Sequence, residues 1–229
     1  MSHRKGILFV GFVSLALVTG LLFVGCTSTP DANTFIENTY FSSGRAAFAN
    51  GDFEGAIANF DQAIRIRPNY AEAFIQRGRA YIEIGDFNRA ITDFDQAIRI
   101  DRNNAEAYNR RGMAYHEKGD FDRAIADFDQ AIRIDPNDAW AYDSRGWAYH
   151  NQGNIDQAIA DYGQAIRIDP NHPWAYVSRG RAYFNERNFG QAIADFDQAI
   201  RIDPNRPWVY TYRGNAYRDR GNFDQAIAD

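Results

Sequence analysis

Apolar residues return along most of this chain with the spacing of a helix, and the whole pattern repeats every 34 residues. In one copy, Tyr108, Gly112 and Tyr115 are separated by four and three residues, which places them on one helix face. A second apolar stripe begins at Phe121, two residues after Gly119, and glycine commonly ends a helix. Each copy therefore predicts two helices joined by a short turn.

Five complete copies and a partial sixth follow one another. The eighth position of each copy is glycine and the twentieth is alanine, so two helices can approach closely there. In the complete copies the twenty-fourth position is Phe or Tyr and the twenty-seventh is alanine. A single hairpin cannot bury both of its apolar faces, so neighbouring copies must stack into a solenoid. The copies occupy residues 37–70, 71–104, 105–138, 139–172, 173–206 and 207–229.

Polar residues at the turns predict caps for these helices. Asp120 stands directly before the second helix of its copy, where a carboxylate accepts hydrogen bonds from free backbone N–H groups. Asn103 with Glu106 predicts a capping box at the helix that begins near Ala105.

The recurring positions resemble the tetratricopeptide repeat, whose pattern is an aromatic residue followed by Gly, Tyr, Ala, Phe, Ala and Pro. In the third copy these are Tyr108, Gly112, Tyr115, Ala124, Phe128, Ala131 and Pro136. Two departures, arginine at the seventh position where the family usually has leucine and Arg102 at a proline position, do not threaten the fold. The resemblance implies an all-α, right-handed superhelical solenoid in which the first helix of each pair lines a concave groove.

The N-terminal segment predicts an export signal and a tether. Basic residues at the start precede an uncharged stretch that ends at Cys26, the only cysteine of the chain. Residues 22–26 resemble a bacterial lipobox, which implies that Cys26 is lipidated and becomes the first residue of the mature protein. We therefore expect a signal peptide over 1–25 and a polar tether over 26–36. An uncleaved anchor is the alternative, because about 20 apolar residues span a bilayer.

Both alternatives place the repeats outside the cytoplasm and tie them to a membrane. In enteric lipoproteins, an Asp directly after the lipidated Cys retains the protein in the inner membrane. Here Thr27 follows Cys26. The resemblance therefore favours the outer membrane, with the repeats facing the periplasm or the cell surface.

The charge pattern excludes nucleic acid as a partner and predicts ion pairs. The formal net charge is −5, which is not the basic footprint that nucleic-acid binding requires. Asp95 with Arg99 and Asp129 with Arg133 are four residues apart, which predicts pairs along the second helix. Two further columns predict an ion ladder beside the helix interface, or alternatively a track for a carboxylated ligand. They are Arg77, Arg111, Arg145, Arg179 and Arg213 at the seventh position, and Asp93, Asp127, Asp161 and Asp195 at the twenty-third.

Candidate partner-binding residues follow from the positions that face the groove in the resembling family. All four tryptophans lie in copies four to six, and large aromatic residues often anchor protein partners. Trp174 and Trp208 alternatively pack on neighbouring prolines. An apolar patch lies at the opposite end, with polar residues between. The predicted groove residues are Phe41, Phe48, Ile75, Ile82, Asn109, Met113, His116, Asp143, Trp147, His150, Trp174, Val177, Arg181 and Trp208.

No motif predicts an enzyme. The chain has no Gly-rich phosphate loop, no helical histidine pair for zinc and no nucleophile elbow. His116 and His150 occupy the same position of adjacent copies, but helices roughly 10 Å apart keep them from sharing one metal ion. We expect no catalytic residue, no metal and no cofactor.

The sequence thus predicts a non-enzymatic scaffold or adaptor that binds protein or peptide partners at a bacterial envelope. The resemblance extends to pilot lipoproteins that assemble pili or secretion machines. A repeat arm of an enzyme such as a glycosyltransferase is the alternative. The sequence stops at Asp229, inside a predicted helix, so either the reading frame is cut, or the last half-repeat frays or pairs with another molecule, which includes self-association.

Overall fold

A computed structural model describes residues 32–228, and within this range the chain is entirely helical. Cys26 and the predicted signal peptide lie outside the described residues. None of the described helices is long and apolar enough to cross a membrane. The helices are α1 (Ala32–Ala49), α2 (Phe53–Ile66), α3 (Ala71–Glu83), α4 (Phe87–Ile100), α5 (Ala105–Glu117), α6 (Phe121–Ile134), α7 (Ala139–Gln152), α8 (Ile155–Ile168), α9 (Pro173–Asn185), α10 (Phe189–Ile202), α11 (Pro207–Arg220) and α12 (Phe223–Ala228).

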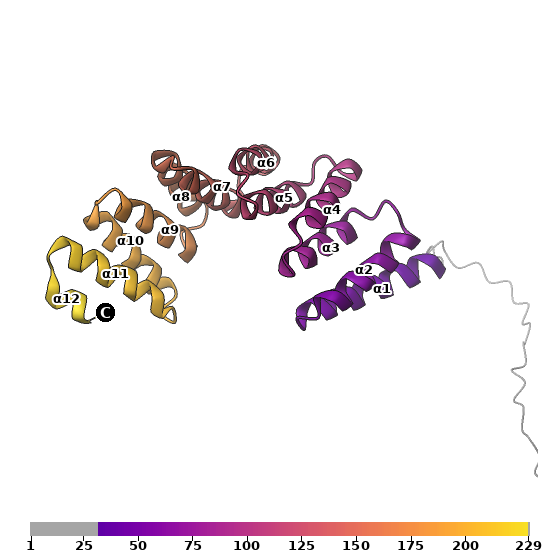
Figure 1. Ribbon diagram of the computed structural model, residues 1–229, viewed down its shortest axis with the longest axis horizontal. Coiled ribbons are helices and arrows are strands. Elements are labelled where there is room, and N and C mark those ends of the chain that lie inside the picture. Colours follow the sequence, from indigo (N-terminus) through magenta and orange to yellow (C-terminus); the bar gives the residue numbers. More distant parts are fainter. Residues whose placement is uncertain (1–31, 229) are drawn as a thin grey trace, which may run out of the picture.

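The helices form hairpins that follow one another along a curved row, from α1 at one end to α12 at the other (Figure 1). Each helix packs mainly against the helices directly before and after it in the sequence. In addition, each odd-numbered helix from α1 to α9 contacts the next odd-numbered helix, so these helices line a common side of the row. The predicted all-α solenoid of helix pairs is confirmed.

The turns follow the sequence closely, with one exception. Gly119 has a φ of 76°, a left-handed conformation that glycine adopts without strain, and it ends the hairpin's first helix as predicted. Asp120 caps α6 by accepting a hydrogen bond from the Arg123 backbone N–H at 3.3 Å. The predicted capping box at Asn103 is wrong, because α5 is capped one residue later. Asn104 accepts from the Ala107 N–H at 2.9 Å.

The close contact between paired helices depends on glycine facing an aromatic ring. A Cβ placed on Gly112 would lie 2.7 Å from a ring carbon of Phe128, which is fully buried. No side chain fits in that space without a shift. The same contact joins Gly44 to Phe60, Gly78 to Phe94, Gly146 to Tyr162 and Gly180 to Phe196.

The first helix begins earlier than predicted. Helix α1 starts at Ala32, so the last five residues of the predicted tether are helical. The sequence has no glycine or proline between Ala32 and Gly44, so nothing interrupts the helix there. Glu37, only 5% exposed, is held by an ion pair with Arg67 at 2.9 Å.

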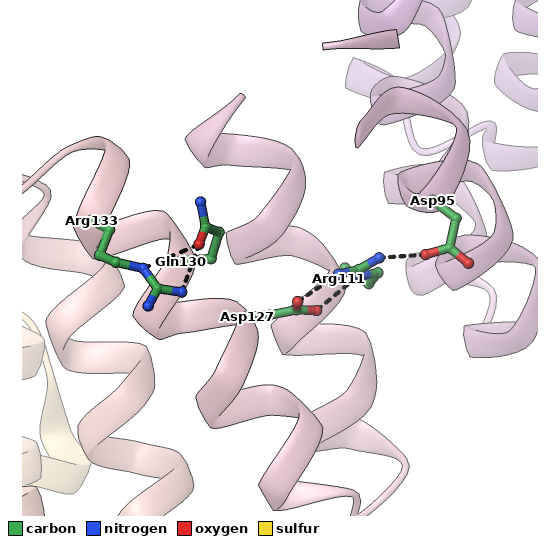
Figure 2. A network of polar contacts seen from close by, with 5 residues as sticks. All are labelled: Asp95, Arg111, Asp127, Gln130 and Arg133. Atoms are coloured by element: carbon green, nitrogen blue, oxygen red, sulfur yellow. Dashed lines mark hydrogen bonds and ion pairs between the residues drawn. The ribbon is translucent and has the colours of Figure 1, made fainter. Parts of the chain in front are cut away.

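The arginine and aspartate columns form the predicted ion ladder, and three of its arginines, Arg77, Arg111 and Arg145, also bond a second carboxylate. In Figure 2, Arg111 donates from Nε and Nη2 to the two carboxylate oxygens of Asp127, at 2.8 and 2.6 Å. Its Nη1 donates to Asp95 of the preceding copy at 2.6 Å. Arg77 bridges Asp93 and Asp61, and Arg145 bridges Asp161 and Asp129, in the same way. Each such arginine therefore joins two copies.

This geometry overturns the predicted pairs along the second helix. Asp95 and Asp129 bond the arginines of the next copy instead of the residues four positions later. Arg133 donates to Gln130 on its own helix, at 3.1 and 2.6 Å (Figure 2). Asp95 and Asp129 bond the ladder arginines because these arginines are mostly buried and need a compensating charge more than exposed Arg133 does.

One step of the ladder is incomplete. Gly163 occupies the position of Asp95 and Asp129 in its copy, so it offers no carboxylate. Arg179 bonds Asp195 through Nε and Nη2, both at 2.8 Å, and its Nη1 lies 3.7 Å from where a Cβ on Gly163 would stand.

Candidate functional site

The odd-numbered helices carry all the predicted groove residues, and these residues differ widely in exposure. Trp147 and Trp174 are 38% and 40% exposed, and Arg181 is also exposed. Ile75 and Val177 are 0% and 3% exposed and belong to the core, so they shape the surface without offering a contact. The half-buried members are Phe41, Phe48, Ile82, Asn109, Met113, Asp143, His150 and Trp208.

The apolar patch predicted at the N-terminal end is largely used for internal packing. Phe41 packs at a tilt against Phe60 and Tyr70, with ring centroids 5.7 and 4.9 Å apart. Phe48 packs on Phe53 at 5.3 Å. These side chains pack the first helices together. The tryptophans exposed on the odd-numbered helices lie in the C-terminal half.

The tryptophans of the C-terminal half pack on one another and on nearby cations. Trp174 and Trp208 are stacked, with centroids 5.3 Å apart and an interplanar angle of 22°. The Arg206 guanidinium lies 4.3 Å over the Trp174 ring. Trp140, 57% exposed, lies beside the His172 ring at 4.3 Å. Trp174 and Trp208 belong to successive copies, so their stacking joins these two copies.

Trp147 rests on a fixed support. The His116 ring lies 3.6 Å from the Trp147 ring, and its Nε2 makes a 2.7 Å hydrogen bond with the Asn151 side-chain amide. His116 is only 7% exposed, and burial lowers its pKa, which favours the neutral imidazole as a hydrogen-bond acceptor. This histidine is therefore a buried support for Trp147.

The two histidines of the groove each have a separate partner. His150 pairs through Nε2 with the Asn185 amide at 2.8 Å. Burial lowers its pKa, and the nearby Arg181 lowers it further. Within residues 32–228, no cluster of three or more metal-ligating side chains forms.

A polar cluster lies beneath the centre of this surface. Burial raises the pKa of Asp143 to about 7, although a hydrogen bond with Ser178 lowers it in part. One Asp143 carboxyl oxygen and the Tyr162 hydroxyl have no hydrogen-bond partner. Burial, together with the Asp143 charge, raises the pKa of Tyr162. A large share of the Asp143 carboxyl groups is therefore protonated at neutral pH.

The ion ladder leaves little support for a ligand track along the arginine column. Arg77, Arg111 and Arg145 each hold two carboxylates of the chain itself. Burial alone would lower the pKa of each, but hydrogen bonds and charges of these aspartates outweigh it and raise the pKa. A carboxylated ligand would have to displace these bonds.

A recess of about 230 Å³ opens between α9 and α11. The Arg181 guanidinium, predicted as a groove residue, lies 5.5 Å from the Tyr212 ring at this recess. The sequence interpretation did not select the other lining residues, although Phe184 and Asn215 occupy the same repeat positions as His150 and Arg181. The lining residues are Arg181, Phe184, Asn185, Phe196, Tyr212 and Asn215.

Family models match almost all of the described chain. Models described as "Tetratricopeptide repeat" match residues 75–139, 128–160, 173–206 and 196–228. A model described as "TPR repeat" matches residues 44–85 and 146–186. No curated protein sequence matches significantly.

Solved structures share the architecture. The crystal structure of MamA is 31% identical, with a TM-score of 0.62, and the match covers 70% of this chain and 94% of that one. PilW, a widely conserved type IV pilus biogenesis factor, is 20% identical with a TM-score of 0.78, covering 84% and 90%. YrrB, a TPR protein with an unusual peptide-binding site, is 22% identical with a TM-score of 0.60, covering 78% and 96%.

Proposed function

Because this chain belongs to the tetratricopeptide repeat family, we propose that it is a non-enzymatic scaffold that binds partner polypeptides along its odd-numbered helices. The observation that carries the proposal is the gathering of exposed tryptophans on α7 and α9. Contiguous exposed apolar patches on a folded protein commonly mark surfaces that bind another molecule.

Trp147 is the side chain best suited to anchor a partner. Its ring is exposed, yet its position is fixed by His116, which Asn151 holds in turn. A rigid aromatic side chain loses little conformational entropy on binding, so more of the contact energy appears as affinity. The similarity in fold to YrrB, described as having a peptide-binding site, supports a polypeptide partner.

Photo-crosslinking tests this surface directly. We would place benzoylphenylalanine at Trp147 and, as a matched control, at exposed Arg133 on α6. We expect covalent adducts with a partner in the cell from position 147 and few from position 133. Trp147→Ala should weaken partner capture at least about tenfold, a loss typical of an anchoring residue. Equal adducts from both positions would contradict the proposal.

We further propose that the scaffold is held at a bacterial envelope through a lipid on Cys26. The support is the lipobox-like sequence that ends there and the absence of a second cysteine for a disulfide. We place the repeats on the periplasmic side or at the cell surface, with the outer membrane favoured. Radioactive palmitate should label the protein in cells, whereas Cys26→Ser should abolish labelling. An inactive alkaline phosphatase fused after Asn33 would contradict export.

Assembly of a surface machine is the specific form of this function that the comparisons favour. PilW is described as a type IV pilus biogenesis factor, and its fold covers 84% of this chain. A pilot role of this kind requires a tethered scaffold with an exposed partner surface. Loss of surface pili on deletion of the gene, restored by the intact chain, is the expected result.

A further inference from the structure

The recess between α9 and α11 has the size of one side chain. Its volume is about 230 Å³. An apolar cavity of about 150 Å³ accommodates benzene, whereas pockets for drug-sized molecules and cofactors measure roughly 300–1,000 Å³. The recess can therefore hold a single Phe- or Leu-sized group but is too small for a cofactor.

The walls of the recess are aromatic and well supported. Phe196, at its base, is only 1% exposed and lies 5.9 Å from the Tyr212 ring. Tyr212 in turn packs against Trp208 at 5.7 Å, and Phe184 packs against Phe189 at 5.5 Å. Because these rings are fixed by neighbours on three helices, the recess is already formed before any ligand arrives.

The recess carries one uncompensated positive charge. Arg181 forms no ion pair within the described part of the chain, whereas the ladder arginines are all paired. Its charge lowers the pKa of His150, after the larger effect of burial, and no carboxylate of residues 32–228 offsets it there. The Asn215 amide, which also lines the recess, makes no hydrogen bond among the same residues.

We propose that this recess binds one Phe- or Leu-sized side chain of a partner polypeptide whose neighbouring residue is Glu or Asp. The apolar group fills the aromatic recess, and the carboxylate accepts hydrogen bonds from Arg181 and Asn215 at its edge. The inference rests on the proposed scaffold function and adds the chemistry of the segment that the partner presents.

A synthetic peptide tests the proposal on the full detergent-solubilised chain. The probe is a biotinylated 12-residue glycine–serine peptide with one central Phe-Glu pair, measured by biolayer interferometry. We expect replacement of its Phe by Ala, or of its Glu by Gln, to weaken binding about tenfold each, the loss expected for one charge-assisted hydrogen bond or a ring-sized contact. Arg181→Met should cause the same loss as the Glu change.

A matched variant and a double-mutant cycle make the test specific. Arg79 occupies the same repeat position three helical pairs earlier, outside the recess, so Arg79→Met should leave binding unchanged. In Arg181→Met protein, the peptide's Glu→Gln change should have no further effect, because the two groups act on each other. Equal losses with Arg79→Met, or additive losses with Arg181→Met, would overturn the proposal.

The result is separable from a failure of the scaffold function. If the peptides bind without dependence on Arg181 while position 147 still crosslinks to a partner, the recess proposal is refuted and the scaffold stands. Binding that is lost because the chain associates with itself, detected by sedimentation, would equally refute the recess as a site for a foreign segment.

Discussion

Restoring the missing carboxylate at Gly163 should stabilise the protein. In the complete steps of the ladder, an aspartate at the corresponding position bonds the Nη1 of the next arginine, as Asp129 bonds Arg145 at 2.6 Å. A Cβ at position 163 would lie 3.7 Å from the Nη1 of Arg179, an ordinary contact that requires no rearrangement. Gly163→Asp therefore places its carboxylate beside a guanidinium that bonds only Asp195 within the described helices.

The expected increase in the free energy of unfolding of Gly163→Asp has two parts of similar size. Replacing glycine inside α8 by an ordinary residue adds about 0.3–0.5 kcal/mol of helix propensity. The new ion pair is only partly shielded, because the Arg179 side chain is 23% exposed and the equivalent Asp129 is 41% exposed. Solvent screening limits its contribution to roughly 0.5–1 kcal/mol. We expect a total near 1 kcal/mol and a rise in Tm of about 2–4 °C.

Three companion variants separate these parts in urea or thermal unfolding. Gly163→Ala reports helix propensity alone, and Gly163→Asn reports a neutral side chain of the same shape. In an Arg179→Met background, Gly163→Asp should lose the ion-pair share of its gain, and high salt should reduce that share. Our reasoning would be refuted if Gly163→Asp were no more stable than Gly163→Asn, or if its gain were independent of Arg179.

Three further changes have expected outcomes. Asp143→Asn should leave the free energy of unfolding nearly unchanged near pH 4 and raise it by roughly 4 kcal/mol at pH 8. The reason is that the raised carboxyl pKa, about 7, makes the wild type lose stability as pH rises from 4 to 7. Urea unfolding at both pH values measures this, and a pH-independent difference would contradict it. Tyr162→Phe should raise the free energy of unfolding by about 1 kcal/mol, since the Tyr162 hydroxyl is buried without a hydrogen-bond partner. A lower urea midpoint for the variant would count against this. Gly112→Ala should lower the free energy of unfolding by about 1–3 kcal/mol, because its Cβ would meet Phe128 at 2.7 Å. The control Gly190→Ala has nothing within 4 Å of its Cβ and should be neutral or slightly stabilising. Similar shifts of the thermal midpoint in both variants would argue against close packing as the cause.

Much of the architecture could be predicted from the sequence because it is local. The 34-residue period fixes helix pairs and turns, and the recurrence of glycine opposite an aromatic residue already indicates which helices touch. Gly119 and Asp120 could be interpreted correctly for the same reason, since each acts on backbone only a few residues away.

What could not be predicted depends on the relative placement of neighbouring copies. The sequence shows that Asp95 is four residues from Arg99, but only the structure shows that buried Arg111 of the next copy is its partner. The groove face presented a similar difficulty. Family positions identify which residues lie near the surface, whereas the burial of Ile75 and His116 depends on the size of the side chains around them.

Each hairpin of residues 32–228 touches mainly its immediate sequence neighbours, so a hairpin at the end of the row can separate without disturbing the contacts of the others. A force applied to the two ends of the molecule should detach hairpins in succession, each at a similar load, in place of one abrupt rupture. The same locality means that duplicating or deleting one whole 34-residue unit in the gene changes the span of the row while preserving every type of joint within it.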